Sequence, residues 1–407
     1  MKGQDRSWVM VPMPVVFVHG VGNHGEEQQA GQAAKLRRQF FAEFLLPAIG
    51  ADPGHGVVLM PWWGRAPALP RWGRVCRPGA SEALGSGDRV SLVKELAAAE
   101  PPPTGRTDDV VLDTARESVA DAVDLLYSAV DVDACTDEDL RQLATLAVPL
   151  ASYCERHRRF DPTDPFWEDV ADDPSLIRAF TATGRTPGPQ VETLGGGGPP
   201  GRVGKLLRRT ADELRKALVG PPVRLTAGGL RRLTDIPVHD YLADVFKYLA
   251  ERGTPEQPGE IVGIVLDDLR KATADAPADE PLVVVAHSMG GNIVYDIASH
   301  FCPKLTIDML VTVGSQVGLF AEFSAFQGVP GDLPVPGGRR KVPARENIRT
   351  WINIVDRGDI LGYSAKPVFE GVEDYDYESG ALWAHSAYFK QPNFHRRLAR
   401  RVRGATA

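Results

Sequence analysis

The chain has 407 residues, 43% hydrophobic and 24% charged, which is ordinary for a soluble protein of one large domain or two to three average ones. A net charge of −7 argues against DNA or RNA as a partner, and no segment reaches the roughly 18 uninterrupted apolar residues of a membrane-spanning helix. The four cysteines lack CxxC spacing, so neither a zinc site nor a disulfide framework is indicated, and we expect a cytoplasmic protein with reduced thiols.

The N-terminal segment predicts a strand, a helix and a second strand. "VVFVHG" (15–20) is a β-branched apolar run ended by glycine, which is typical of a buried strand. Apolar residues at helical spacing then predict a helix over about 26–46, and "GVVLMPWWG" (56–64) reads as the next strand. Together they form one parallel crossover unit, so we expect residues 1–65 to be the first part of an α/β core.

The middle of the chain, residues 66–235, predicts a mainly helical insertion. Apolar residues over 111–130 fall on one helical stripe, and a second helix starts near Thr136 or Asp137, either of which could be its N-cap. The stretch near 183–204 is rich in glycine and proline and predicts a flexible loop.

Alternating strands and helices return over residues 236–407, which we expect to be the second part of the core. The predicted elements are helices over 238–252, within "PGEIVGIVLDDLRKATADA" and over 289–301, strands over 282–286, 307–313 and 350–355, and a short terminal helix. The charges of the acidic run 370–380 are closely spaced, and we expect them to be solvated. The chain therefore has the pattern of an α/β protein.

A compressed turn at Ser288 carries the strongest chemical signal. Ala286-His287-Ser288-Met289-Gly290 is a G-x-S-x-G pattern with alanine at the first small position, and it stands between a predicted strand and a predicted helix. Such a turn strains the serine backbone and projects the hydroxyl above the carboxyl edge of the sheet. Ser288 is therefore a candidate nucleophile; the alternative is a serine that only caps the following helix.

Backbone amides at the same edge could stabilise an oxyanion. His19-Gly20 ends the first strand, so the amide of Val21 would face the edge that carries the Ser288 turn. Paired with the amide of Met289, it would form a two-donor oxyanion hole. We expect His19 itself to be structural.

Four stretches in this order resemble the α/β-hydrolase superfamily, and within it the lipase-like serine esterases: "VVFVHGVG", "VVVAHSMGG", "WINIVDRGDIL" and "WAHSAYF". The matched segments cover both ends of the chain, about half of it with the intervening helices. The resemblance implies an α/β-hydrolase fold, with a mostly parallel central sheet flanked by helices. The chain departs from the family in carrying Ala286 for the usual glycine and in its long insertion.

In that family the nucleophile is followed by an acid after a later strand and by a histidine near the C-terminus. The resemblance therefore implies His385 as the base and Asp359, which precedes two apolar residues, as the acid of a Ser-His-Asp triad. Asp356 at the strand end is the second choice for the acid. The implied reaction is hydrolysis of a carboxylic ester, of a small molecule or a lipid, through an acyl-serine, without a cofactor or a metal.

Other functions stay open at this level. The same triad could serve a thioesterase, an amidase or an acyltransferase, and a non-catalytic interaction protein could keep the hydrolase scaffold. The chain has no transmembrane segment by sequence, but peripheral contact with a membrane remains compatible with it. The sequence does not identify the substrate.

Overall fold

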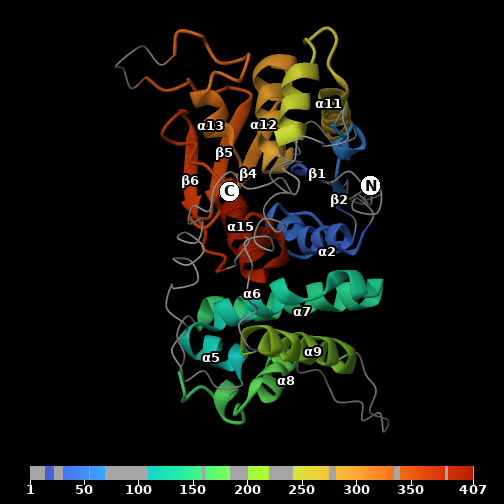
Figure 1. Ribbon diagram of the computed structural model, residues 1–407, viewed down its shortest axis with the longest axis vertical. Coiled ribbons are helices and arrows are strands. Elements are labelled where there is room, and N and C mark those ends of the chain that lie inside the picture. The colour runs from blue at the N-terminus through green and yellow to red at the C-terminus, as the bar shows by residue number, and fades with distance from the viewer. Residues whose placement is uncertain are drawn as a thin grey trace, which may run out of the picture.

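The computed structural model describes residues 14–22, 31–54, 56–68, 109–157, 161–183, 200–219, 242–274, 281–333, 340–380 and 384–406. The molecule is elongated, with an α/β part at one end of its longest axis and a helical part at the other (Figure 1). The prediction of an α/β fold with a parallel sheet, flanking helices and a large helical middle region is confirmed.

The described residues form one six-stranded sheet in which every neighbouring pair is parallel, in the order β2-β1-β3-β4-β5-β6. The strands are β1 (Pro14–Val18), β2 (Val57–Leu59), β3 (Val283–His287), β4 (Ile307–Val313), β5 (Ile348–Val355) and β6 (Val372–Asp376). Strands β1, β3 and β4 are nearly continuous runs of apolar residues, as expected of parallel strands that are covered on both faces.

The direction of chain progress across the sheet reverses between β1 and β3. From β1 the chain continues to β2 on one side, whereas β3, β4, β5 and β6 follow one another on the other side. In open parallel sheets, ligands bind beside the carboxyl ends of the strands at such a reversal. The loops after Val18 and after His287 meet at this point.

One face of the sheet packs against helices that follow in the second half of the chain. They are α11 (Glu260–Ala274), α12 (Met289–Asp296) with its π-helical extension η5 (Ile297–Phe301), α13 (Val317–Glu322) and the helical residues 242–251. Buried strand residues such as Val284 and Leu310 share a core with Val262 and Ile293 of these helices.

The other face of the sheet is covered by helices from the two ends of the chain. They are α2 (Gln32–Phe40), its π-helical extension η1 (Phe41–Leu45), α3 (Leu46–Ala48) and α15 (Pro392–Thr406). Phe41 and Phe394 pack on the strand residues Phe17 and Val285. Residues on the opposite side of α2, such as Phe40, belong instead to the core of the middle region.

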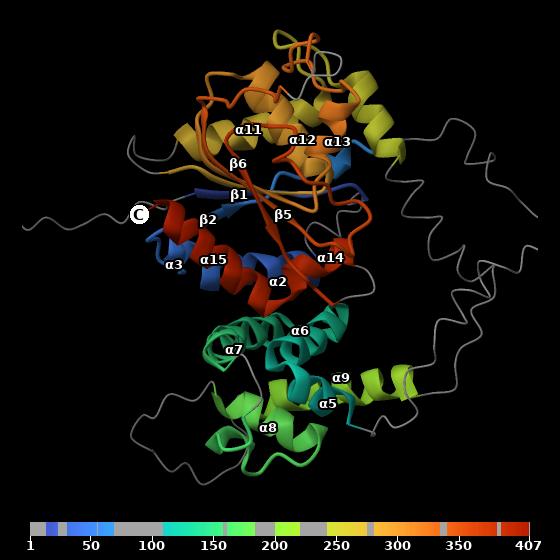
Figure 2. The same ribbon diagram turned by 90° about the vertical axis from the view of Figure 1, so that its left-hand side faces the viewer.

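The middle region stacks beneath these helices. Its elements are α5 (Val110–Glu117), α6 (Val119–Ala129), α7 (Asp137–Arg156), α8 (Asp173–Thr183) and α9 (Pro200–Val219), with short helical turns at η3 (Val132–Ala134) and η4 (Pro165–Trp167). Three further short turns belong to the α/β part: η2 (Trp63–Arg65), α14 (Ala384–Ala387) and η6 (Tyr388–Lys390). Figure 2 shows the resulting layers: α11 to α13, the sheet, α2 with α15, α6 with α7, and finally α5, α8 and α9. The sheet therefore contacts the middle region mainly through α2 and α15, and Tyr377, the residue after β6, also bonds to Asp124 of α6.

Two expectations from the sequence are wrong in part. The stripe over 111–130 belongs to two helices, because Ser118 leaves the helical conformation and its Oγ accepts the Asp121 amide as an N-cap. Residues 200–204 of the expected loop 183–204 begin α9, while 184–199 lie outside the described residues. The charged side chains of the acidic run 370–380 are mostly exposed, as expected, but the run also contains β6, which pairs with β5 and buries its Val372.

The expected domain limits stay predictions. Residue 235 lies outside the described residues, and helical residues 242–251 beyond it already pack with the sheet core through Val245 and Tyr248. Among the residues that the structure describes, no helix is long and apolar enough to span a membrane.

Candidate functional site

The turn between β3 and α12 holds Ser288 in a strained conformation. Its φ is 53° and its ψ is −127°, a region that non-glycine residues rarely adopt. The Ser288 amide donates to the Val313 carbonyl (2.9 Å), and Ser315 Oγ donates to the Ser288 carbonyl (2.8 Å). Both backbone groups of the serine are therefore held by the loop after β4, which fixes the direction of its side chain.

The two glycines after Ser288 allow α12 to approach the sheet. A Cβ on Gly290 would collide with the carbonyl oxygen of Val18, and one on Gly291 would collide with Ser315 Oγ. Ala286, in the first small position of the motif, is fully buried on β3. The two glycines of "AHSMGG" are thus required by the close approach of Val18 at the end of β1 and of Ser315 after β4.

The base predicted from the sequence lies next to the serine. His385 is on α14, and its Nε2 is 2.9 Å from Ser288 Oγ. Its Nδ1 is 2.9 Å and 3.0 Å from the two carboxylate oxygens of Asp359. Because a carboxylate only accepts, Nδ1 carries the proton and Nε2 is left to accept from the serine hydroxyl.

Asp359 is held in place by several donors. Its side chain is fully buried, and it accepts from the Leu361 amide (2.9 Å) and from Tyr388 Oη (2.9 Å) in addition to His385. Burial and the charge of Asp359 raise the pKa of Tyr388, so that its phenol stays protonated as a donor. The carboxylate oxygens therefore have partners that orient them toward the imidazole.

Asp356, the second choice for the acid, has a different task. One of its oxygens accepts from the Gly358 amide (2.7 Å) and the other from the Ser379 amide (2.7 Å). These bonds cap the turn after β5 and tie it to the segment after β6. In this arrangement Asp356 supports the loop that carries Asp359, and its two oxygens are directed to backbone amides rather than to His385.

The loop after β1 runs directly past the serine. A Cβ on Gly20 would lie only 2.7 Å from Ser288 Cβ, so the backbone beside Val21 passes close to the reacting hydroxyl. Met289 opens α12, and the first amides of a helix have no intrahelical acceptor. Both predicted oxyanion donors, Val21 and Met289, thus belong to segments that meet at Ser288.

Long-range contacts hold this loop. Gly22, at φ 81°, donates its amide to Oδ2 of Asp244 (3.2 Å), a buried residue of the helix 242–251. Trp63 Nε1 donates to the His19 carbonyl (2.8 Å), and the two rings stack at 5.0 Å. His19 is buried there, in agreement with the structural role expected for it.

A second histidine, which the sequence did not connect with the base, supports the main chain of His385. His287 Nε2 donates to the His385 carbonyl oxygen (2.8 Å), and the two rings are 4.8 Å apart. Burial, followed by the charge of His385, lowers the pKa of His287 well below its usual value, so it is neutral at physiological pH.

Three further residues of the site were not found from the sequence, and the sequence patterns that could have indicated them differ. Tyr388 follows His385 by three residues, a spacing that places both on one side of a helical turn and could have suggested a contact. Asp244 is 222 residues from Gly22, and no local pattern links them. Gly314, at φ 53°, is a third case: its Cβ would lie 2.6 Å from Asp359 Oδ2.

The site joins a serine hydroxyl, an imidazole and a carboxylate in one hydrogen-bonded series, beside backbone amides at a helix start. Within the described ranges, no three His, Cys, Asp or Glu side chains are arranged to hold a metal ion. Comparisons with known protein families, with curated proteins and with solved structures gave no match for this chain.

Proposed function

We propose that this protein is a serine hydrolase of the α/β-hydrolase fold that cleaves a carboxylic ester through an acyl-serine intermediate. The observation that carries the proposal is the continuous series from Ser288 Oγ to His385 (2.9 Å) and on to Asp359 (2.9 Å), starting at a strained serine between a strand and a helix. A serine hydroxyl is a weak nucleophile without such a base, and the base needs a group that fixes its tautomer.

In the first half of the reaction, His385 Nε2 takes the hydroxyl proton as Ser288 Oγ attacks the carbonyl carbon of the ester. The amides of Val21 and Met289 donate to the oxyanion of the tetrahedral intermediate. His385 then protonates the leaving alcohol oxygen, and the acyl group stays on Ser288. Asp359 keeps the Nδ1 proton in place and stabilises the imidazolium.

In the second half, His385 takes a proton from water while the water oxygen attacks the acyl carbon. Collapse of the second tetrahedral intermediate releases the carboxylic acid and returns the proton to Ser288 Oγ. The order of the groups along the chain, serine, then aspartate, then histidine, supports this assignment, as does the position of Ser288 at the reversal of the sheet order.

Apolar side chains exposed on the segments that build the site support an apolar ester as substrate. Ile360, next to Asp359, is 80% exposed, and Tyr363 in the same loop is 38% exposed. Leu242 and Phe246 are exposed on the helix whose Asp244 holds the loop after β1. Exposed apolar residues on segments that build a site are a common sign of an apolar ligand.

Labelling with a fluorophosphonate tests the proposal, because the probe reacts with a serine only when a base activates it. We expect wild-type protein to be labelled and Ser288→Ala to be unlabelled, whereas Ser324→Ala, which changes an exposed serine that also has positive φ, keeps full labelling. No labelling of the folded wild type would contradict the proposal and favour a non-catalytic interaction protein.

A panel of p-nitrophenyl esters of increasing acyl length tests the substrate class. Exposed apolar residues predict that kcat/KM rises with acyl length. A preference for acetyl esters would contradict an apolar substrate while leaving the hydrolase proposal intact, and a preference for thioesters or amides would identify one of the related activities.

A further inference from the structure

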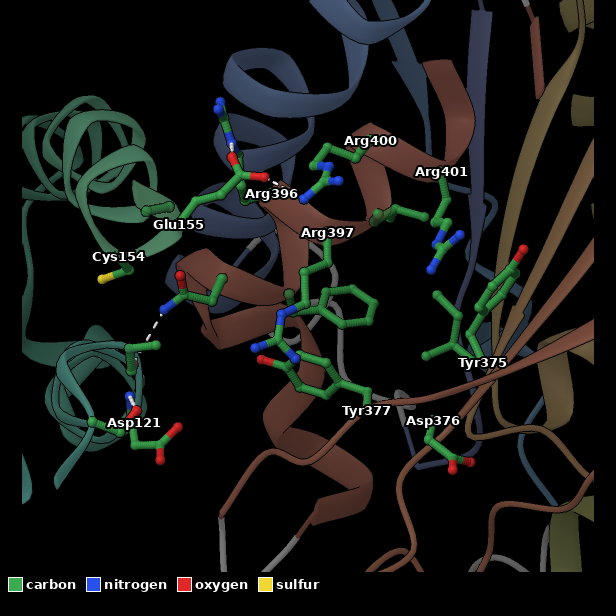
Figure 3. Close-up of a pocket in the computed structure, with 17 residues that line it drawn as sticks. Asp121, Cys154, Glu155, Tyr375, Asp376, Tyr377, Arg396, Arg397, Arg400 and Arg401 are labelled. Carbon is green, nitrogen blue, oxygen red and sulfur yellow. Dashed lines mark hydrogen bonds and ion pairs between the residues drawn. The ribbon is translucent and has the colours of Figure 1, made fainter. Parts of the chain in front are cut away.

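A cavity of about 550 Å³ lies where the helical middle region meets the core (Figure 3). Its walls come from α6 and α7 on one side and from β6 and α15 on the other, and none of its lining residues belongs to the Ser288 site. The volume is in the range of small-molecule sites. The cavity is therefore a candidate for a binding function that ester hydrolysis does not use.

Four arginines of α15 line this cavity: Arg396, Arg397, Arg400 and Arg401. Their spacing creates two pairs that are each one helical turn apart, which places each pair on its own side of the helix. Arg396 Nε is 2.9 Å from Glu155 on α7, and Arg400 forms an ion pair with the same carboxylate. One pair therefore connects α15 to the middle region.

The other pair faces aromatic rings instead of a carboxylate. The guanidinium of Arg401 lies 4.0 Å from the centre of the Tyr375 ring, and that of Arg397 lies 5.3 Å from the centre of the Tyr377 ring. Figure 3 shows both side chains extending from α15 toward these tyrosines. Among the residues that the structure describes, neither guanidinium forms an ion pair.

The charges around the cavity leave an excess of positive charge. Glu155 is neutralised by the first arginine pair, and Asp376 forms an ion pair with Arg357 (2.7 Å). Asp121 remains, at the N-terminal turn of α6, whose amides carry a partial positive charge, together with Asp124 behind the Tyr377 ring. Burial and the charge of Asp124 raise the pKa of Tyr377, whereas the charge of Arg397 lowers it.

We propose that this cavity binds a small molecule that carries a doubly charged phosphate group, such as a phosphate monoester or a diphosphate. Two unpaired guanidiniums one turn apart match a dianion whose oxygens point in several directions, and guanidinium forks bind phosphate oxygens in pairs. A single carboxylate carries one charge, which one of the two guanidiniums would neutralise. The two tyrosine rings keep the guanidiniums in position in the empty site.

Binding here would join the two parts of the molecule. The ligand would contact α15 and the end of β6 from the core together with the start of α6 from the middle region. Because it binds only when these walls are assembled, it stabilises their association by mass action. The proposal does not depend on the activity of Ser288.

Isothermal titration calorimetry of the full chain with pyrophosphate tests the proposal, at constant ionic strength because exposed charges are screened by salt. We expect binding by wild type and an affinity at least about tenfold weaker in Arg397→Gln/Arg401→Gln, since two charge-assisted contacts are lost. The matched control is Arg208→Gln/Arg209→Gln, which removes two exposed charges from α9 outside the cavity and should bind like wild type.

A variant that should increase the affinity for pyrophosphate distinguishes loss of binding from loss of folding. Asp121→Asn removes the negative charge at the cavity and should tighten pyrophosphate binding by about two- to fivefold. No wild-type binding at about 10 mM pyrophosphate, or binding that the first double variant leaves unchanged, would overturn the proposal. Malonate bound as tightly as pyrophosphate would overturn the assignment to phosphate.

Discussion

The carboxyl edge of the sheet and the helical middle region hold their polar groups in different places. At the edge, Ser288 and Asp359 are both buried, and both are hydrogen-bonded to His385. The serine backbone is strained. In the middle region most of the core is apolar, polar side chains such as Ser118 and Thr136 cap helix ends, and the buried Asp173 accepts from backbone amides at the start of α5. The edge thus holds polar side chains in contact with one another, whereas the middle region uses them mainly to complete its helices.

This difference predicts opposite responses to similar substitutions. Changes at the edge should reduce activity by more than they reduce stability, because geometry there is held by a few specific contacts. Changes in the middle region should alter the free energy of unfolding and leave ester hydrolysis unchanged. Asp124 of α6 is a boundary case, since it contacts both parts.

The largest effect on kcat is expected at Asp359, with the neighbouring Asp356 as the comparison. Asp359→Asn should lower kcat by about 10⁴-fold, because an amide no longer fixes the tautomer of His385. Asp356→Asn keeps one acceptor for its two amides and should lower kcat by about tenfold or less. Steady-state hydrolysis of a p-nitrophenyl ester measures both; equal losses would mean that Asp356 shares the role of the acid.

A glycine-to-alanine substitution should be harmful at the sheet edge and beneficial in the middle region, because the first reduces activity and the second increases stability. Gly314→Ala places a Cβ 2.6 Å from Asp359 Oδ2 at a positive φ, so the carboxylate must move and activity should fall about 100-fold. Gly204→Ala, in α9, meets only Thr181 at an ordinary 3.7 Å and should stabilise the protein by about 0.5–1 kcal/mol. Kinetics and urea unfolding separate the two, and a reversed pattern would contradict the comparison.

Asp124 should make stability depend on pH. Tyr377 Oη lies 2.7 Å from Gln391 Oε1 and 3.1 Å from Asp124 Oδ2, and one phenolic proton cannot serve both acceptors. A protonated Asp124 completes this network by donating to Tyr377. Burial raises the pKa of Asp124 to about 7 from its model-compound value of 3.8, despite bonds from Asn393 and Tyr377 that lower it.

The folded state therefore keeps a proton that the unfolded state releases between about pH 4 and pH 7, and stability falls as pH rises through this range. Asp124→Asn imitates the protonated form and should be more stable than wild type at pH 8, on the order of 2 kcal/mol, with little difference at pH 4. Urea unfolding across this pH range measures the effect. If the free energies of unfolding of Asp124→Asn and wild type differ by the same amount at every pH, Asp124 stays ionised in the folded protein.

The smallest effect is expected at a helix end. Thr136 forms a capping box with Asp139: the Asp139 amide donates to Thr136 Oγ1 (3.2 Å), and the Thr136 amide donates to Asp139 Oδ2 (3.0 Å). Thr136→Ala should cost about 1 kcal/mol of stability without changing kcat. Loss of activity in a folded variant would show that the middle region influences the site.

Much of the fold can be predicted from the sequence because buried parallel strands are simple patterns. β1, β3 and β4 are apolar runs, and the spacing of small residues around Ser288 follows from its tight turn. β6 was missed because its residues are mostly polar, and only its pairing with β5 makes it a strand. The break at Ser118 was hidden by a continuous apolar stripe.

The candidate site was predictable to the extent that each residue follows a recognisable strand or motif. Ser288, Asp359 and His385 could be named in this way, although their catalytic roles stay predictions. The contacts that support them could not, since Asp244 to Gly22 and His287 to His385 join segments that are distant in sequence. Such contacts depend on the sheet order and not on local residue patterns.

The proposed mechanism requires a covalent acyl group on Ser288. Brief exposure to an activated short-chain ester, followed by intact mass spectrometry and peptide mapping, detects an acyl-enzyme. We predict one acyl group on Ser288 in wild type and in Ser324→Ala, and none in Ser288→Ala. A folded protein that gains no acyl group, or gains it on another residue, would contradict the account.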